Sequence, residues 1–156
     1  MNKIYIVILV LLTIILTGCF AKKDIINELG LNNTCQIKEQ QDTHGGFLGD
    51  GDYFAKIECK KINYKKLSKG WEKLPIPSEL VKATEMTMCD DKECSDIYEK
   101  YSIPNIKNGY YYFLDRHPDS KDKYDYNNIN NRSSYNYTFA LLDMDSKTFY
   151  YYELDT

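Results

Sequence analysis

The chain has 156 residues and a formal net charge of −3. This length fits one domain of ordinary size with a real core. The slightly acidic balance argues against a nucleic-acid partner, because proteins that bind nucleic acids carry clustered basic residues. It also leaves no basic stripe that would hold the folded surface against anionic lipid.

The N-terminus has the pattern of a secretion signal. Lys3 precedes an apolar run, IYIVILVLLTIIL, over residues 4–16. A helix that spans a membrane needs roughly 20 apolar residues, so this run is short for a permanent anchor and fits the apolar core of a signal peptide. The alternative is an uncleaved N-terminal membrane helix.

The apolar run ends in LTGC, residues 16–19, which resembles the lipobox of bacterial lipoproteins. The resemblance implies a signal peptide over residues 1–18 and attachment of a lipid with palmitate-type acyl chains to Cys19. Residues 19–33 would form a lipid-anchored segment ahead of a single domain at 34–156. Two or more acyl chains attach a protein stably to a membrane. We therefore expect the protein at the extracytoplasmic face of the cell membrane.

Two segments alternate in the strand period, residues 34–42 and 52–60. A hairpin centred on Phe47 would join them. The facing pairs would be Cys35 with Cys59, Ile37 with Ile57, and Gln41 with Tyr53. Directly opposed residues have the spacing that a disulfide needs, so we expect a Cys35–Cys59 bond, with Cys89 and Cys94 left to each other. Reduced thiols or a four-cysteine metal site are the alternatives.

The connection between these strands, DTHGGFLGDGDYF, is rich in glycine and acids. Its glycines suit a tight, strongly curved turn. A functional interpretation makes candidate binding residues of His44, Phe47, Asp50 and Asp52, with the acids as possible cation ligands. The spacing departs from that of an EF-hand and only one histidine is present. A glycine-built turn with solvated acids is therefore favoured, and no metal or cofactor is expected.

Helical segments are expected over residues 64–70, 78–88 and 95–101, with Asn63 capping the first. Trp71, the only tryptophan, is interpreted as a core residue that locks the first helix to the sheet. The break between the first two helices falls at the LPIP sequence, where proline disfavours helix.

Three further features complete the fold prediction. Strands are expected over residues 108–117, 134–143 and 148–154, because they are rich in tyrosine and phenylalanine. Residues 118–132 are polar and predict a long exposed loop. The fold class is therefore α+β: a single small domain with an antiparallel sheet of about five strands and two or three short helices, after an N-terminal signal peptide.

Asp115 and His117 form a second pair of candidate binding residues at the end of a predicted strand. Alternate strand residues share a face, so the two side chains lie on one side and Arg116 on the other. An acid beside a histidine can set its pKa and orientation for catalysis. The favoured alternative is an ion pair and a turn-capping histidine before Pro118.

The combination of DTHGGFLGDGDYF, GWEKLPIP, IPNIKNGYYYFLDRH and SYNYTFALLDMDSKTFYYYELDT resembles a family of small proteins and lipoproteins of Gram-positive bacteria. The resemblance extends from about Asp42 to Thr156. It implies one domain built as a unit, and it carries no catalytic residue over to this chain.

The expected function is that of a membrane-anchored extracytoplasmic lipoprotein with a non-catalytic binding domain, possible forms being an immunity or inhibitor protein. Its partners would be the membrane, through the lipid, and a protein, peptide or cell-wall component. The alternative is a metal-dependent or His/Asp hydrolase at the cell surface, which requires His44 and His117 to converge. An accessory component of a transporter is a third option.

Overall fold

The structure is a computed structural model that describes residues 21–31, 34–45, 49–87 and 97–156. The chain forms two compact units. The smaller contains the described part of Met1–Asn33 together with Ile62–Ser68, and the larger contains Thr34–Lys61 and Lys69–Thr156. No helix among the described residues is long and apolar enough to cross a bilayer. The apolar run at residues 4–16 and the cysteines Cys19, Cys89 and Cys94 lie outside the described residues.

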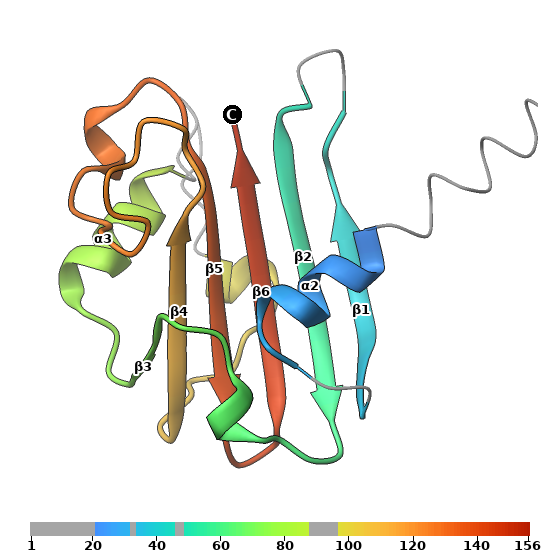
Figure 1. The fold of residues 1–156 in the computed structure, drawn as a ribbon. Helices are drawn as coiled ribbons and strands as arrows, with labels where there is room; N and C mark the ends of the chain where they lie inside the picture. Colours follow the sequence, from blue (N-terminus) through green and yellow to red (C-terminus); the bar gives the residue numbers. More distant parts are fainter. Residues whose placement is uncertain (1–20, 32–33, 46–48, 88–96) are drawn as a thin grey trace, which may run out of the picture. The chain divides into compact units, whose positions relative to one another are not determined.

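The larger unit is built on one antiparallel sheet of six strands in the order β1-β2-β6-β5-β4-β3 (Figure 1). The strands are β1 (Cys35–Asp42), β2 (Gly51–Cys59), β3 (Trp71–Lys73), β4 (Gly109–Asp115), β5 (Asn136–Asp143) and β6 (Thr148–Asp155). The prediction of an α+β fold around one antiparallel sheet is confirmed. The strand count is six instead of five, because the short edge strand β3 was not predicted.

The β1–β2 hairpin confirms the expected disulfide. Cys35 pairs with Cys59 and Ile37 with Ile57 across the two strands. The Cys35–Cys59 bond is formed, with an S–S distance of 2.04 Å. Ala55, Ile57 and Cys59 are buried on one face of β2, as the alternation predicts.

The register expected near the turn is wrong by one residue. A bulge between Ile37 and Glu39 inserts one residue into β1, so that Gln41 faces Phe54 and Asp42 faces Tyr53. A bulge turns every later side chain of its strand to the opposite face. It thereby places Asp42 on the same face as Tyr53, which the simple hairpin did not anticipate.

Strands β4, β5 and β6 form the centre of the sheet, and their aromatic runs are buried on both faces. Tyr111, Phe113, Tyr137 and Tyr152 point to one face, and Tyr112 and Tyr151 to the other. Such double burial explains why these strands are almost continuously apolar or aromatic instead of alternating with polar residues.

Trp71 begins the edge strand β3. The predicted helix over residues 64–70 is only a 3-10 turn, η1 (Tyr64–Lys66), and the chain then becomes the edge strand β3. Asn63 caps the turn as expected, because its side chain accepts a hydrogen bond from the Lys65 N–H. The Trp71 ring packs against Tyr112 and Phe149, with centroid distances of 5.4 and 5.6 Å. It therefore packs against aromatic residues of the sheet.

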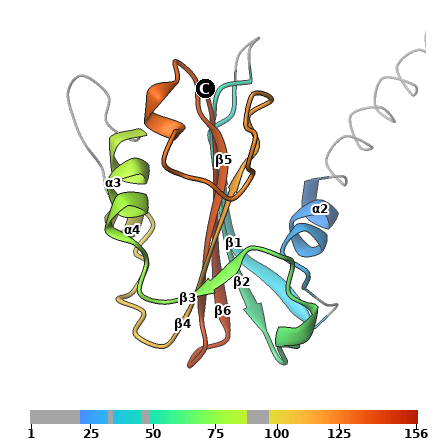
Figure 2. The same cartoon turned by 60° about the vertical axis from the view of Figure 1, so that its left-hand side comes forward.

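Short helices lie on one side of the sheet (Figure 2). They are α3 (Ser78–Thr87), α4 (Ile97–Lys100) and the 3-10 turn η2 (Ile129–Asn131). Their buried residues Leu80, Ala83, Ile97 and Ile129 join the core cluster with the aromatic residues of the sheet. Within the polar stretch 118–132, Ile129 is thus an anchor that holds the loop to the core.

The smaller unit contains α2 (Ala21–Glu28) and η1. Gly30 has a positive φ of 68°, and a Cβ at this position would lie 2.3 Å from the Lys66 carbonyl oxygen. Only glycine allows this close backbone approach, which the Ser68 N–H to Leu29 carbonyl bond also supports.

Candidate functional site

The glycine-rich connection between β1 and β2 is held by its own polar residues. Thr43 exchanges hydrogen bonds with Asp52: its N–H donates to the Asp52 carbonyl at 2.9 Å, and its hydroxyl accepts from the Asp52 N–H at 2.8 Å. The Gly45 N–H donates to the Asp50 carbonyl at 3.3 Å. Hydrogen bonds therefore join residues 43–45 to residues 50–52 across the turn.

Gly51 makes this closure sterically possible. A Cβ at Gly51 would lie 2.5 Å from the Cα of His44 and 2.9 Å from the carbonyl carbon of Thr43. Real side chains do not tolerate such distances to backbone atoms. The glycine is thus required where the two halves of the turn meet, which confirms the interpretation of a glycine-built turn.

Asp52 connects the turn to α4 on the helical side of the sheet. Its buried carboxylate accepts from Lys100 Nζ at 2.5 Å, from the Tyr101 hydroxyl at 2.7 Å, and from the Thr43 hydroxyl. Burial raises the pKa of Asp52, but these hydrogen bonds and the charge of Lys100 outweigh it and hold the pKa below its ordinary value. The Tyr101 ring also stacks on Phe54 at a centroid distance of 4.1 Å. Asp52 is therefore a buried anion and not a solvated acid, which corrects the sequence-based interpretation.

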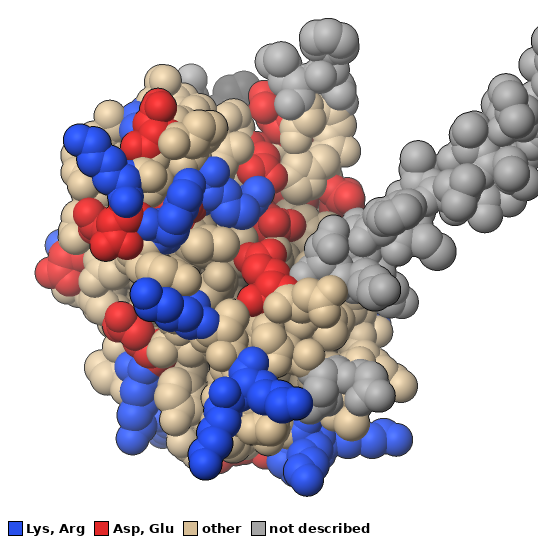
Figure 3. Space-filling view, in the orientation of Figure 1, with Lys and Arg blue, Asp and Glu red and all other residues tan. Residues whose placement is uncertain are grey.

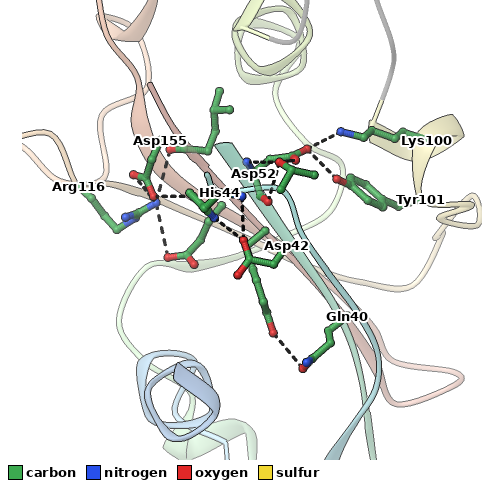
Figure 4. A network of polar contacts seen from close by, with 12 residues as sticks. Gln40, Asp42, His44, Asp52, Lys100, Tyr101, Arg116 and Asp155 are labelled. Atoms are coloured by element: carbon green, nitrogen blue, oxygen red, sulfur yellow. Dashed lines mark hydrogen bonds and ion pairs between the residues drawn. The ribbon is translucent and has the colours of Figure 1, made fainter. Parts of the chain in front are cut away.

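His44 connects the turn to the C-terminal strand on the opposite side of the sheet (Figure 4). Its Nδ1 lies 2.8 Å from Asp42 Oδ1, and its Nε2 lies 3.3 Å from Asp155 Oδ2. A histidine can donate from both nitrogens only as an imidazolium. Burial lowers the pKa of His44, but the bonds to Asp42 and Asp155 outweigh this effect and raise the pKa above 6.5.

Arg116 continues this network across β5 and β6. Its Nη2 lies 3.1 Å from Asp155 and 3.5 Å from Glu153, and its Nε donates to the Thr138 hydroxyl at 3.1 Å. Burial lowers the pKa of Arg116, but the negative charges of Glu153 and Asp155 outweigh this effect and raise the pKa above its ordinary value. We call the eight residues of this network the polar clasp: Asp42, Thr43, His44, Asp52, Lys100, Tyr101, Arg116 and Asp155. It ties the β1–β2 turn to both faces of the sheet.

Asp115 and His117 form a separate cluster. The Asp115 carboxylate is buried and accepts a bidentate pair from Arg132, at 3.1 and 2.6 Å. The His117 N–H donates to Asp115 Oδ1 at 3.1 Å. Burial raises the pKa of Asp115, but the bonds to Arg132, Ser120 and His117 outweigh it and lower the pKa below its ordinary value. Asp115 is therefore ion-paired, but its cation is Arg132, which the sequence did not identify, and Arg116 pairs with Glu153 and Asp155 instead.

The His117 ring caps the loop that follows it. Its Nδ1 accepts from the Asp119 N–H at 3.2 Å, which assigns the ring proton to Nε2, where the Ser134 hydroxyl lies 3.2 Å away. Both nitrogens are thus used within the loop. This arrangement agrees with a turn-capping histidine and differs from a poised general base.

The predicted site residues therefore divide into two groups. His44 and Asp52 belong to the polar clasp on opposite faces of the sheet, and exposed Asp50 lies beside them in the turn. Asp115 and His117 belong to the Arg132 cluster. Phe47 lies outside the described residues. Within the described ranges, no group of three or more His, Cys, Asp or Glu residues is arranged to hold a metal ion.

The sequence did not identify the partners of these residues. Lys100 and Tyr101 reach Asp52 from a helix far along the chain, and no local pattern signals that contact. The register of β2 on β6 places Gly51 opposite Asp155, which brings Asp155 next to the turn. That pairing joins strands separated by most of the domain, so alternation within each strand cannot reveal it.

No protein-family model, curated protein or solved structure matches the chain.

Proposed function

We propose that this chain is a membrane-anchored extracytoplasmic lipoprotein whose domain binds a protein, peptide or cell-wall partner without catalysis. The anchor follows from the LTGC motif at residues 16–19, which would hold the domain at the outer face through a lipid on Cys19. The β1–β2 turn, with its exposed acid Asp50, is the surface that we assign to the partner.

One observation supports binding over catalysis: each candidate acid–base residue already bonds to other residues of the domain. Both nitrogens of His44 and of His117 lie against partners within the domain, and the carboxylates of Asp52 and Asp115 each accept from a cation. A general base must be free to take a proton from a substrate. A network of this kind instead fixes the described residues on either side of the turn, and a preorganised surface loses little entropy on binding.

The charge distribution is compatible with a protein or peptide partner. Lysine and arginine side chains and acidic side chains both occur over the face shown in Figure 3. Mixed charge of this kind supports selective contacts better than general adhesion to a polyanion.

Chemical crosslinking in intact cells tests this proposal. The full chain, captured by an affinity tag, should retain a specific partner that Asp50→Lys loses, because the substitution reverses a charge beside the turn. The matched control is Glu58→Lys, which reverses an exposed charge near the other end of β2 and should leave capture unchanged. Capture of the same proteins by all three chains, or of none, would contradict the proposed function.

The hydrolase remains the second candidate only if the two histidines act together. The structure assigns His44 and His117 to different hydrogen-bond networks. We expect the His117→Ala chain to keep partner capture and the His44→Ala chain to capture less, because His44 holds the turn that we assign to the partner. A cell-surface hydrolytic activity abolished by both substitutions would favour the hydrolase instead.

A further inference from the structure

An apolar groove of about 620 Å³ lies on the helical side of the sheet, and no residue of the polar clasp lines it. The segment between β3 and α3 lines it with Leu74, Pro75 and Ile76. The segment between α4 and β4 lines it with Ile103, Pro104 and Ile106, and Leu141 of β5 is buried within the lining. The volume lies within the roughly 300–1,000 Å³ that is typical of small-molecule sites.

The groove carries a single charge. Lys107 is the only charged residue in its lining, and the lining contains no acidic residue. Lys107 is exposed and makes no ion pair with a described residue. The groove therefore complements a ligand that is mainly apolar and bears one negative charge.

We propose that this groove binds a long-chain fatty acid, with the alkyl chain along Leu74, Ile76 and Ile106 and the carboxylate at Lys107 Nζ. Each methylene that leaves water for an apolar site contributes favourably to binding, and an ammonium group at the rim selects the ionised head. Fatty-acid binding goes beyond the proposed function. It rests on that function in one respect: the membrane anchor would place the domain next to a source of acyl chains.

Photo-crosslinking of the full chain tests the proposal. The chain is reconstituted in phosphatidylcholine vesicles that contain a palmitic acid with a diazirine on its chain, and the crosslinked peptides are mapped by mass spectrometry. Adducts are expected in residues 74–81 and 98–107. Excess unlabelled palmitic acid should compete for them, and its methyl ester should compete less well.

Two groove variants and one control sharpen the test. Lys107→Ala should lower the adduct yield roughly two- to fivefold, the range expected for an exposed ion pair. Ile106→Glu should lower it further by placing a carboxylate beside the ligand. Lys121→Ala, which removes a lysine that does not line the groove, should leave the yield unchanged. Thermal melting of each variant establishes that it is folded.

Adducts confined to residues 1–33, or insensitive to both groove variants, would overturn the proposal. A second result would also overturn it: the groove carries no adducts, and Ile106→Glu abolishes a crosslink between two proteins. The occupant of the groove would then be a second copy of the chain or a peptide. Failure of the anchor is distinguishable from these outcomes. An unlipidated Cys19 would contradict the proposed function, whereas the vesicles supply the fatty acid whether or not Cys19 is modified.

Discussion

His44 is the residue whose charge state matters most to the polar clasp. Because both ring nitrogens face carboxylates, protonation strengthens its contacts with Asp42 and Asp155. The folded-state pKa is raised above the ordinary value of 6.5. Its contribution to stability is therefore full below about pH 6.5 and is lost as the pH rises through the raised folded-state pKa.

His44→Gln should lower the free energy of unfolding by about 1 kcal/mol at about pH 5.5 and by much less at about pH 9. Glutamine can still form hydrogen bonds but cannot carry the charge. Urea denaturation of both chains at the two pH values measures the difference. An equal loss at both values would show that His44 acts by packing alone.

Asp115 presents the opposite case, a buried carboxylate that depends on one arginine. Arg132→Met should lower the free energy of unfolding by about 3 kcal/mol at neutral pH, because it leaves the charge of Asp115 buried without its cation. Asp115 has a lowered pKa, so its contribution is present above its ordinary pKa and is lost as the pH falls through the folded-state value.

The double variant Asp115→Asn with Arg132→Met separates the charge from the packing. It should recover part of the stability that Arg132→Met loses, since no buried charge remains unpaired. Urea denaturation at neutral pH compares the two variants. If the double variant were instead less stable than Arg132→Met, the unpaired charge of Asp115 would not be the reason that Arg132→Met is destabilised.

For single residues, the sequence identified the polar residues of the motif but did not identify the residues that contact them. The acids and histidines of the motif were identifiable because they are concentrated in one short stretch. Asp52 was expected to be solvated, yet Lys100 and Tyr101 bury and neutralise it. Such a contact depends on where a distant helix packs, and no spacing rule contains that information.

Among the elements, the β1–β2 hairpin is the one that the motif determines most closely. Gly51→Ala should lower the free energy of unfolding by about 2–3 kcal/mol, because its Cβ would overlap the backbone of His44. Gly45→Ala is the matched control: a Cβ there meets only the Thr43 carbonyl at 3.8 Å, and the expected change is within about 0.5 kcal/mol. Equal effects measured by urea denaturation would contradict the close-approach explanation.

The disulfide stabilises the same hairpin from its open end. The bonded residues are 24 positions apart, and closing a loop of that size in the unfolded chain contributes about 3 kcal/mol. The double variant Cys35→Ala and Cys59→Ala should lose about this amount in urea denaturation. Wild-type protein in reductant should approach the same midpoint; a midpoint unchanged by reductant would exclude the disulfide as a stabiliser.

Element types were predictable where a period ran for several residues. Alternation identified β1 and β2 and paired their cysteines, and aromatic runs identified β4, β5 and β6. Two details were not predictable. The bulge after Ile37 leaves no composition signal, and Trp71 shares a helical spacing with Tyr64 and Leu67 although the structure places it in an edge strand.

For the molecule as a whole, we propose that a lipid on Cys19 holds this domain at the outer face of the membrane. The apolar run before it is short for a permanent anchor, and residues 16–19, LTGC, resemble the lipobox pattern. The folded domain has a small net charge and mixed surface charges, so the lipid is the expected source of attachment.

Metabolic labelling of cells with palmitate tests whether Cys19 carries the lipid. We expect the wild-type chain to carry label and to sediment with the membrane fraction, with a mature N-terminus at Cys19. Cys19→Ala should abolish the label, whereas Cys59→Ala should retain it, because Cys59 is committed to the disulfide with Cys35. Label that persists in Cys19→Ala, or a wild-type chain without label that retains residues 1–18, would show that Cys19 does not carry the anchor.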